Sequence, residues 1–214
     1  MAEKNYYGTY AVFKTEDKDE GMALLGPDNP VGTKYDIVIT ESDGHDVAWI
    51  KNKFGKMMGC LDEDTTHQVK LCKARGWEPH AFLSYLAFTE EPKPGFYWGE
   101  VAIMAYSPAL NSCMCVFEKN LMKHMSNGTR PNISFGEGSV KQIQQTKGQW
   151  FPTDRVKMPK MKKGTALVKD QQGFNERLIE ESRKGNKGCY ALTVVFYAVI
   201  IAAVAFGLHS CGVF

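Results

Sequence analysis

The feature that most constrains this chain is an uncharged run of nineteen residues, Tyr190–Leu208, with six more residues after it. As a helix the run would be about 28 Å long at 1.5 Å per residue, close to the thickness of the hydrocarbon core of a bilayer. It therefore predicts one transmembrane helix over residues 189–208 and a short extracytoplasmic tail over 209–214. The residues expected along the span include Tyr190, Val194, Tyr197, Ile201, Val204 and Leu208.

Basic residues beside the run predict the orientation. Arg183, Lys184 and Lys187 precede it, and neither Lys nor Arg follows it. Positive residues favour the cytoplasmic side of a span, and the first residues of the chain lack the apolar segment of a secretory signal. We therefore expect a tail-anchored, single-pass membrane protein with its N-terminal head in the cytoplasm.

The formal net charge of +2 hides an asymmetry along the chain. Residues 151–188 hold ten Lys or Arg against five Asp or Glu, whereas residues 1–150 hold sixteen against nineteen. A basic segment beside a membrane gains from anionic lipid head groups. The sequence therefore predicts a basic juxtamembrane linker over 151–188 that lies on lipid; a nucleic-acid patch is the alternative.

The head over residues 1–150 is expected to be an α+β domain built on a small, antiparallel, β-rich and barrel-like sheet. Alternating and β-branched residues predict strands at 6–14, 35–41, 47–50, 55–61, 80–89 and 97–106, with the second and third forming a hairpin. Helices are expected after a cap at Asp64 or Thr65, at 109–125, and from 138 or 139 to 146, with a short polar helix in the linker between Asp170 and Lys184.

One stretch of the head resembles a known family. The loop Pro27-Asp-Asn-Pro30 is followed by the apolar Ile37-Val-Ile39, then by Gly55-Lys-Met-Met-Gly-Cys-Leu61 and a capped helix. This order is similar to that of HIRAN domains and covers roughly residues 7–90. The chain departs from the family's pattern at Gly26, where an acidic residue is usual, and at Gly32-Thr-Lys, where an aspartate is common.

The resemblance implies a small β-rich barrel, and some HIRAN domains bind ends of single-stranded DNA. Tyr85, Tyr97 and Trp98 could stack on bases, although such aromatics also serve as core or cross-strand residues. The net acidic head lacks the clustered Lys and Arg that phosphate contacts need. Nucleic acid therefore enters as an alternative partner, implied by the resemblance.

The polar and thiol side chains predict no catalytic residue, metal site or cofactor. Cys113 and Cys115 stand two residues apart on an expected helix, so they point about 200° apart and cannot converge. Cys60, His67, Cys72 and His80 have no metal-ligand spacing. In a reducing compartment all four cysteines of the head are expected as thiols. Glu90 and Glu91 are neighbours at a strand end and face opposite ways, which is unsuitable for paired acid and base work.

Two further features concern the predicted span. Ala198 with Ala202, and Ala203 with Gly207, are small residues four apart that would let two such helices pack as a homodimer, the alternative being a lipid-facing surface. Cys189 lies at the expected cytoplasmic edge, where S-acylation occurs in other proteins.

Three functions follow as hypotheses. The first is a non-enzymatic binding or adaptor domain for an unknown protein or small-molecule ligand, held at the membrane. The second is a HIRAN-like nucleic-acid-binding module at the membrane, and the third is a thiol-dependent enzyme.

Overall fold

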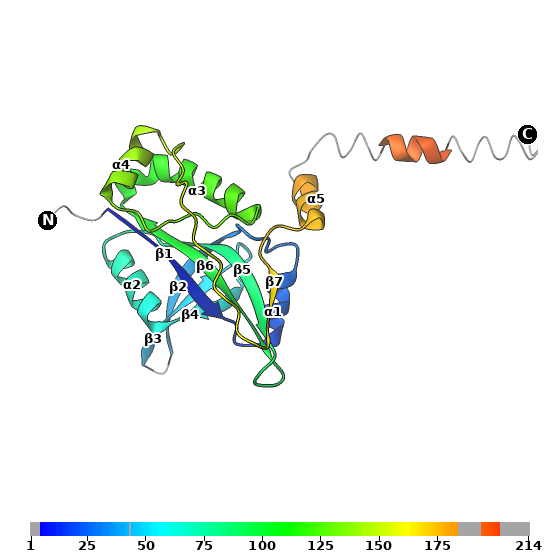
Figure 1. Cartoon of the computed structure of the whole chain (residues 1–214), viewed down its shortest axis with the longest axis horizontal. Helices are drawn as coiled ribbons and strands as arrows, with labels where there is room; N and C mark the ends of the chain where they lie inside the picture. Colours follow the sequence, from blue (N-terminus) through cyan, green and yellow to red (C-terminus); the bar gives the residue numbers. More distant parts are fainter. Residues whose placement is uncertain (1–4, 43, 184–193, 202–214) are drawn as a thin grey trace, which may run out of the picture. The chain divides into compact units, whose positions relative to one another are not determined.

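The structure is a computed structural model that describes residues 5–42, 44–183 and 194–201 (Figure 1). Its contacts divide the chain into two compact units, Met1–Gln172 and Gly173–Phe214. The first unit contains the sheet and most of the helices, and each unit is described by itself.

Six antiparallel strands of the first unit close into a barrel. The order around it is β2-β3-β4-β1-β6-β5, and the pairing of Lys34–Asp36 with His80–Phe82 joins β2 to β5 and closes the ring. A seventh strand extends the sheet along another part of β5. The strands are β1 (Tyr6–Lys14), β2 (Lys34–Ser42), β3 (His45–Lys51), β4 (Met57–Leu61), β5 (His80–Thr89), β6 (Phe96–Tyr106) and β7 (Thr165–Lys169).

Alternate residues of each strand fill the interior of the barrel, as the two-residue period of a strand requires. Phe13, Ile37, Ile50, Val101 and Ile103 are fully or almost fully buried in one cluster. Leu24 joins this cluster from helix α1 (Lys18–Leu25), whose N-terminus is capped by the Asp17 carboxylate accepting from the backbone N–H of Glu20.

The other face of β5 and β6 is covered by helices, which explains why these strands are apolar on both faces. Helix α3 (Asn111–Ser126) follows a short 3₁₀ turn, η1 (Pro108–Leu110), and helix α4 (Glu137–Gln145) lies next to it (Figure 1). Phe117 and Leu121 of α3 pack with Phe82 and Met104 of the sheet in a second buried cluster. The sequence predicted a central strand with apolar residues on both faces for residues 80–89, and β5 confirms that prediction.

Helix α2 (Glu63–Ala74) begins two or three residues before the start predicted from a cap at Asp64 or Thr65. Its cap is Asp62, whose carboxylate accepts from the backbone N–H of Thr65 at 2.7 Å. Asp64 and Thr65, the predicted caps, lie inside the first turn. The prediction of the cap was wrong because Asp62 and Asp64 are equivalent as N-cap residues and only the position of the preceding strand distinguishes them.

The second unit contains helix α5 (Phe174–Arg183), within the range predicted for a short polar helix, and a helical stretch at residues 194–201. In the ranges that the structure describes, no helix has both the length and the apolar character needed to span a bilayer. The predictions of a transmembrane helix, of tail anchoring and of a single-pass membrane location are therefore wrong.

The prediction rested on composition alone, whereas a span requires a helix that is both long and apolar enough to cross the hydrocarbon core. The described helical stretch has eight residues and would be about 12 Å long, against about 30 Å of hydrocarbon. The α+β barrel is the part of the predicted fold class that the structure shows. Outside the described residues lie Lys184, Lys187, Cys189, Tyr190, Ala202, Ala203, Val204, Gly207, Leu208 and the predicted tail 209–214.

Candidate binding site beside strand β1

Among the described residues, the first seven of the nine residues of β1 have a strand on only one side. β1 pairs with β6 along its whole length, from Tyr6 to Lys14, but with β4 only at Phe13 and Lys14. The reason is the length of β4, which has five residues against nine in β1. Among the described residues no strand pairs with residues 6–12 on the β4 side. We call this stretch the β1 edge.

A polar groove of about 590 Å³ lies on one side of the β1 edge, against the first turns of α2 and the start of β3. We call it the α2 groove. Helix α2 is held there by Thr66, whose hydroxyl accepts from the backbone N–H of Ala48 at 3.2 Å, and by the buried Val69. Its charged side chains are Asp46, Glu63, Asp64 and Lys70, and His45 and His67 also line it.

The α2 groove carries three carboxylates against one lysine. Lys70 donates to Asp46 in an ion pair. Within the described part of the chain, neither Glu63 nor Asp64 forms an ion pair. The groove is therefore negative on the helix side, at the first turn of α2.

A second groove, of about 650 Å³, lies on the other side of the β1 edge, and we call it the α4 groove. It is lined by Tyr6, by Phe135, and by Val140 and Lys141 of α4, among others. The rings of Tyr6 and Phe135 stack at 5.0 Å. Because Tyr7 and Thr9 line both grooves, the two grooves meet at β1. Figure 1 shows β1 starting between α2 and α4.

The wall of the α4 groove is fixed to β1 by two tyrosine hydroxyls. Tyr6 donates to the carbonyl of Ile133 and Tyr10 to the carbonyl of Pro131, both at 2.8 Å. Gly8 permits this close approach, since a Cβ atom there would lie 2.2 Å from the Ile133 oxygen. The segment 131–135 therefore rests directly on β1 and places Phe135 at the groove.

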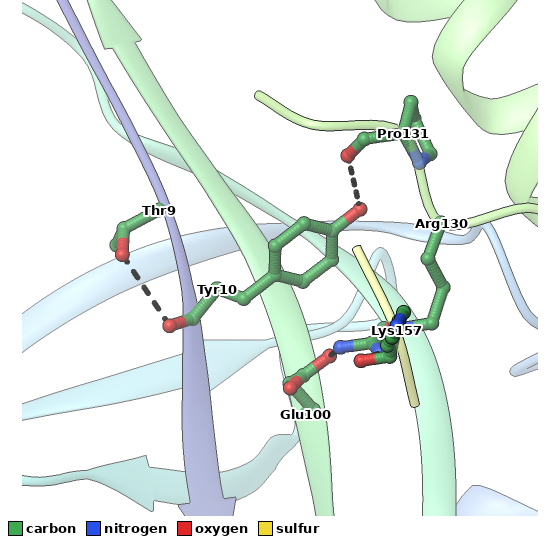
Figure 2. Close-up of polar contacts among 7 residues, drawn as sticks. Thr9, Tyr10, Glu100, Arg130, Pro131 and Lys157 are labelled. Atoms are coloured by element: carbon green, nitrogen blue, oxygen red, sulfur yellow. Dashed lines mark hydrogen bonds and ion pairs between the residues drawn. The ribbon is translucent and has the colours of Figure 1, made fainter. Parts of the chain in front are cut away.

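A buried ion pair anchors the start of the same segment (Figure 2). Arg130 and Glu100 are each 7% exposed, and Arg130 Nη2 donates to the Glu100 carboxylate. Its Nε donates to the Ser84 hydroxyl at 3.2 Å and its Nη1 to the carbonyl of Lys157 at 2.5 Å. Burial raises the pKa of Glu100, although the charge and hydrogen bonds of Arg130 act against that rise. A buried charge needs such a partner.

Two aromatic rings flank the Arg130 guanidinium, with ring centroids at 4.9 Å for Tyr10 and 5.6 Å for Tyr85. The network joins Arg130 to the sheet through Ser84 and Glu100, and to a later part of the chain through the Lys157 carbonyl. It therefore positions the segment 131–135, which leads to the α4 groove. The Arg130–Glu100 pair at its centre is buried.

A second buried carboxylate, Glu118 of α3, is 4% exposed. Its Oε1 lies 3.0 Å from His80 Nδ1 and accepts from the Tyr106 hydroxyl at 2.9 Å, and its Oε2 accepts from Lys34 Nζ at 2.8 Å. Burial alone would raise the pKa of Glu118, but the hydrogen bonds and charges of His80 and Lys34 lower it below the ordinary value. The cluster ties α3 to β2, β5 and β6.

The cysteines do not come together. Cys72 and Cys113 are buried, Cys60 is half-buried and Cys115 is exposed, all four as free thiols. Cys113 and Cys115 face opposite ways on α3, as their spacing predicted. Burial raises the pKa of the Cys60 and Cys72 thiols, which opposes formation of a thiolate.

The other residues singled out in the sequence also lie apart. His67 lines the α2 groove, while His80 contacts Glu118. No group of three His, Cys, Asp or Glu residues suited to a metal ion occurs in the ranges described. Glu90 and Glu91 are exposed between β5 and β6.

The aromatic residues considered for base stacking are packing residues. Tyr85 is fully buried and meets Trp98 edge to face at 5.9 Å, while the Trp98 indole donates to the Thr89 hydroxyl at 2.8 Å. Tyr97 lies tilted against Phe88 at 4.8 Å. In the second unit Arg183 ends α5, and Val194, Tyr197, Ala198 and Ile201 are exposed.

Sequence reasoning missed the β1 edge, the Arg130–Glu100 pair and the Glu118 cluster. The β1 edge depends on which strand pairs with β1 and over what length, and one sequence does not record that pairing. The two buried clusters depend on contacts between distant residues, 30 positions apart in Arg130–Glu100 and 38 in His80–Glu118, and carry no local pattern.

Comparison of this chain with family models, with curated proteins and with solved structures found no match. The resemblance over residues 7–90 therefore rests on its motifs alone.

Proposed function

We propose that the barrel is a non-enzymatic binding module whose ligand occupies the α2 and α4 grooves on the two sides of β1. The observation that carries the proposal is that the grooves meet at Tyr7 and Thr9, so that together they offer one continuous site. Their volumes lie in the range of ligand-binding clefts, and they combine charged groups with the exposed parts of aromatic residues.

Binding is favoured over catalysis by the state of the reactive groups. Glu118 and Glu100 are buried and engaged in ion pairs and hydrogen bonds, so neither is available as a general base. The raised pKa of the Cys60 and Cys72 thiols is the opposite of what an activated nucleophile needs. A thiol-dependent enzyme would require a cysteine that alkylates faster than free cysteine, which iodoacetamide labelling followed by mass spectrometry would detect.

The proposal is tested by screening a small-molecule fragment library against the full chain with amide NMR. We expect the shifted amides to belong to Tyr7, Thr9 and the residues that line the two grooves. Val140→Asp should abolish shifts in the α4 groove, whereas the matched change Val168→Asp, at an exposed site on β7, should leave them. Fragments that shift only residues elsewhere would overturn the proposal.

A single-stranded nucleic-acid module is the second candidate, favoured by one observation. The closed antiparallel barrel is the architecture that the HIRAN resemblance implies. The carboxylates of the α2 groove oppose a phosphate backbone. Titration of a labelled single-stranded oligonucleotide at two salt concentrations separates the candidates, because a phosphate interface weakens steeply with salt.

A further inference from the structure

We infer that the ligand of this site is an extended peptide segment, with basic and apolar residues in alternation, that pairs with the β1 edge as an added strand. This inference rests on the proposed function, because it names the ligand class of the same grooves. It depends on the open strand edge, on the chemistry of the two grooves, and on the placement of those grooves on opposite sides of β1.

The backbone supplies the first part of the argument. In an antiparallel ladder each residue turns both its N–H and its C=O to one neighbour, and successive residues alternate. Along residues 6–12, β6 forms hydrogen bonds with half of the backbone N–H and C=O groups. In the described part of the chain, no strand pairs with the other half. An open row of this kind is a template for another strand.

The side chains of an added strand would meet two different surfaces. Tyr6 and Tyr10 pack on the side of β1 that carries Phe135 and α4, whereas Ala11 and Phe13 pack on the side that carries Val69 of α2. Since successive residues of a strand face opposite ways, one set would point into the α2 groove and the other into the α4 groove.

The chemistry of the two grooves selects the residues of the peptide. Glu63 and Asp64 make the α2 side negative, so residues that point there should be Lys or Arg. On the α4 side Glu137 and Lys141 carry opposite charges, so this groove has no net charge, and Phe135 and Val140 offer contact to apolar side chains. The geometry thus points to alternation of basic and apolar residues.

Two other occupants fit the charges less well. A second copy of this chain pairing through its own β1 would bring Tyr7, Thr9 and Ala11 to the α2 side, and residues 6–12 contain no Lys or Arg. A nucleic acid would place phosphates next to Glu63 and Asp64. A basic and apolar peptide matches both surfaces.

The probes are fluorescent nine-residue peptides titrated against the full chain. The first alternates Lys with Val, the second alternates Glu with Val, and the third has the composition of the first with all Lys before all Val. We expect binding of the first peptide only. Equal binding of the first and third would overturn the inference, because charge alone would then explain it.

Two N-methylated forms of the alternating Lys and Val peptide test strand pairing directly. One carries methyl groups on the odd amides and the other on the even amides. Because only alternate amides face β1, we expect one form to lose at least about tenfold in affinity and the other to retain it. Equal affinity of both forms would contradict strand addition.

Charge-removing variants identify the groove. The double variant Glu63→Gln with Asp64→Asn should weaken the Lys and Val peptide by about tenfold. The matched control is Glu90→Gln with Glu91→Gln, which removes two exposed carboxylates from the turn between β5 and β6 and should leave affinity unchanged. The same loss in both double variants would overturn the assignment to the α2 groove.

The peptide inference and the proposed function fail in different ways. If fragments occupy the grooves and no peptide binds, the binding site stands and its ligand is not a peptide. If neither fragments nor peptides reach the grooves, both proposals fail. Light scattering tests whether a second copy occupies the edge instead. If it detects a dimer that excludes the peptide and that persists in the Glu63 and Asp64 double variant, the edge belongs to a second copy and the inference is overturned.

Discussion

At the scale of single residues, two buried tyrosines differ in one hydrogen bond. Tyr6 donates to the Ile133 carbonyl, whereas the Tyr85 hydroxyl is buried without a hydrogen-bond partner among the described residues. Burial, reinforced by the charge of Glu100, raises the pKa of Tyr85 to about 12, against a lowering effect of Arg130. An unsatisfied buried hydroxyl lowers the free energy of unfolding, while a satisfied one raises it.

Removing these hydroxyls should therefore have opposite effects. We expect Tyr85→Phe to raise the free energy of unfolding by about 1 kcal/mol and Tyr6→Phe to lower it by about 1 kcal/mol. Urea denaturation of both variants and the wild type measures the two changes. Destabilisation by Tyr85→Phe equal to that of Tyr6→Phe would show that the Tyr85 hydroxyl has a partner in solution.

Glu118 gives a pH-dependent prediction. Its pKa is lower in the folded state than its ordinary value, so the stability it contributes is present above the unfolded-state pKa and is lost as the pH falls through the folded-state pKa. Glu118→Gln should lower the free energy of unfolding by about 2 kcal/mol at pH 7. The difference from the wild type should shrink as the solution becomes more acidic.

Denaturation of both proteins at a series of pH values measures this convergence. The matched control is Glu91→Gln, an exposed carboxylate that should change stability little at any pH. A constant difference between Glu118→Gln and the wild type down to pH 2 would contradict the assigned role of the ion cluster.

At the scale of elements, the segment 131–135 depends on a glycine in the strand below it. A Cβ atom on Gly8 would lie 2.2 Å from the Ile133 carbonyl oxygen and 2.3 Å from the Tyr6 hydroxyl. The segment would have to move, and Phe135 with it. Gly8 therefore connects the packing of β1 to the shape of the α4 groove.

We expect Gly8→Ala to lower the free energy of unfolding by about 2 kcal/mol through overpacking and to weaken fragment binding in the α4 groove. Gly138→Ala is the control, since a Cβ atom there meets nothing within 4 Å and should stabilise helix α4. Thermal unfolding and amide NMR measure both. Unchanged stability in Gly8→Ala would contradict the close approach.

Strands with a buried face were predictable from the sequence, whereas exposed or very short elements were not. β1, β5 and β6 follow the predicted ranges because burial leaves apolar residues in the sequence, at successive positions in β5 and β6, which are covered on both faces. β7 was missed because it is exposed at its centre and follows a stretch of Pro, Lys and Met, and α1 because eight residues give too few turns for a period. The transmembrane prediction rested on hydropathy alone, and no helix in the described residues is long and apolar enough to span a bilayer.

The candidate site was less predictable than the fold. Glu118 lay within a predicted helix as one of several charged residues, and nothing local marked it as buried among His80, Tyr106 and Lys34. The β1 edge depends on which strands pair and over what length. Such pairings between distant segments leave no signal in one sequence.

At the scale of the whole molecule, the first compact unit holds the complete candidate site. Within the described residues, its barrel is closed by β2 and β5 but leaves residues 6–12 of β1 without a second neighbouring strand, and α2 and α4 line a negative groove and a partly apolar groove beside that edge. In our proposal, the stability of the fold and the binding of a ligand therefore use opposite sides of the same strand.

Hydrogen exchange of the β1 amides in the full chain, with and without the alternating Lys and Val peptide, measures strand addition at β1 itself. Between residues 6 and 12, we expect the amides that point away from β6 to become protected by at least about tenfold when the peptide is added, while those already bonded to β6 change little. Unchanged exchange along this stretch in the presence of bound peptide would contradict strand pairing at β1.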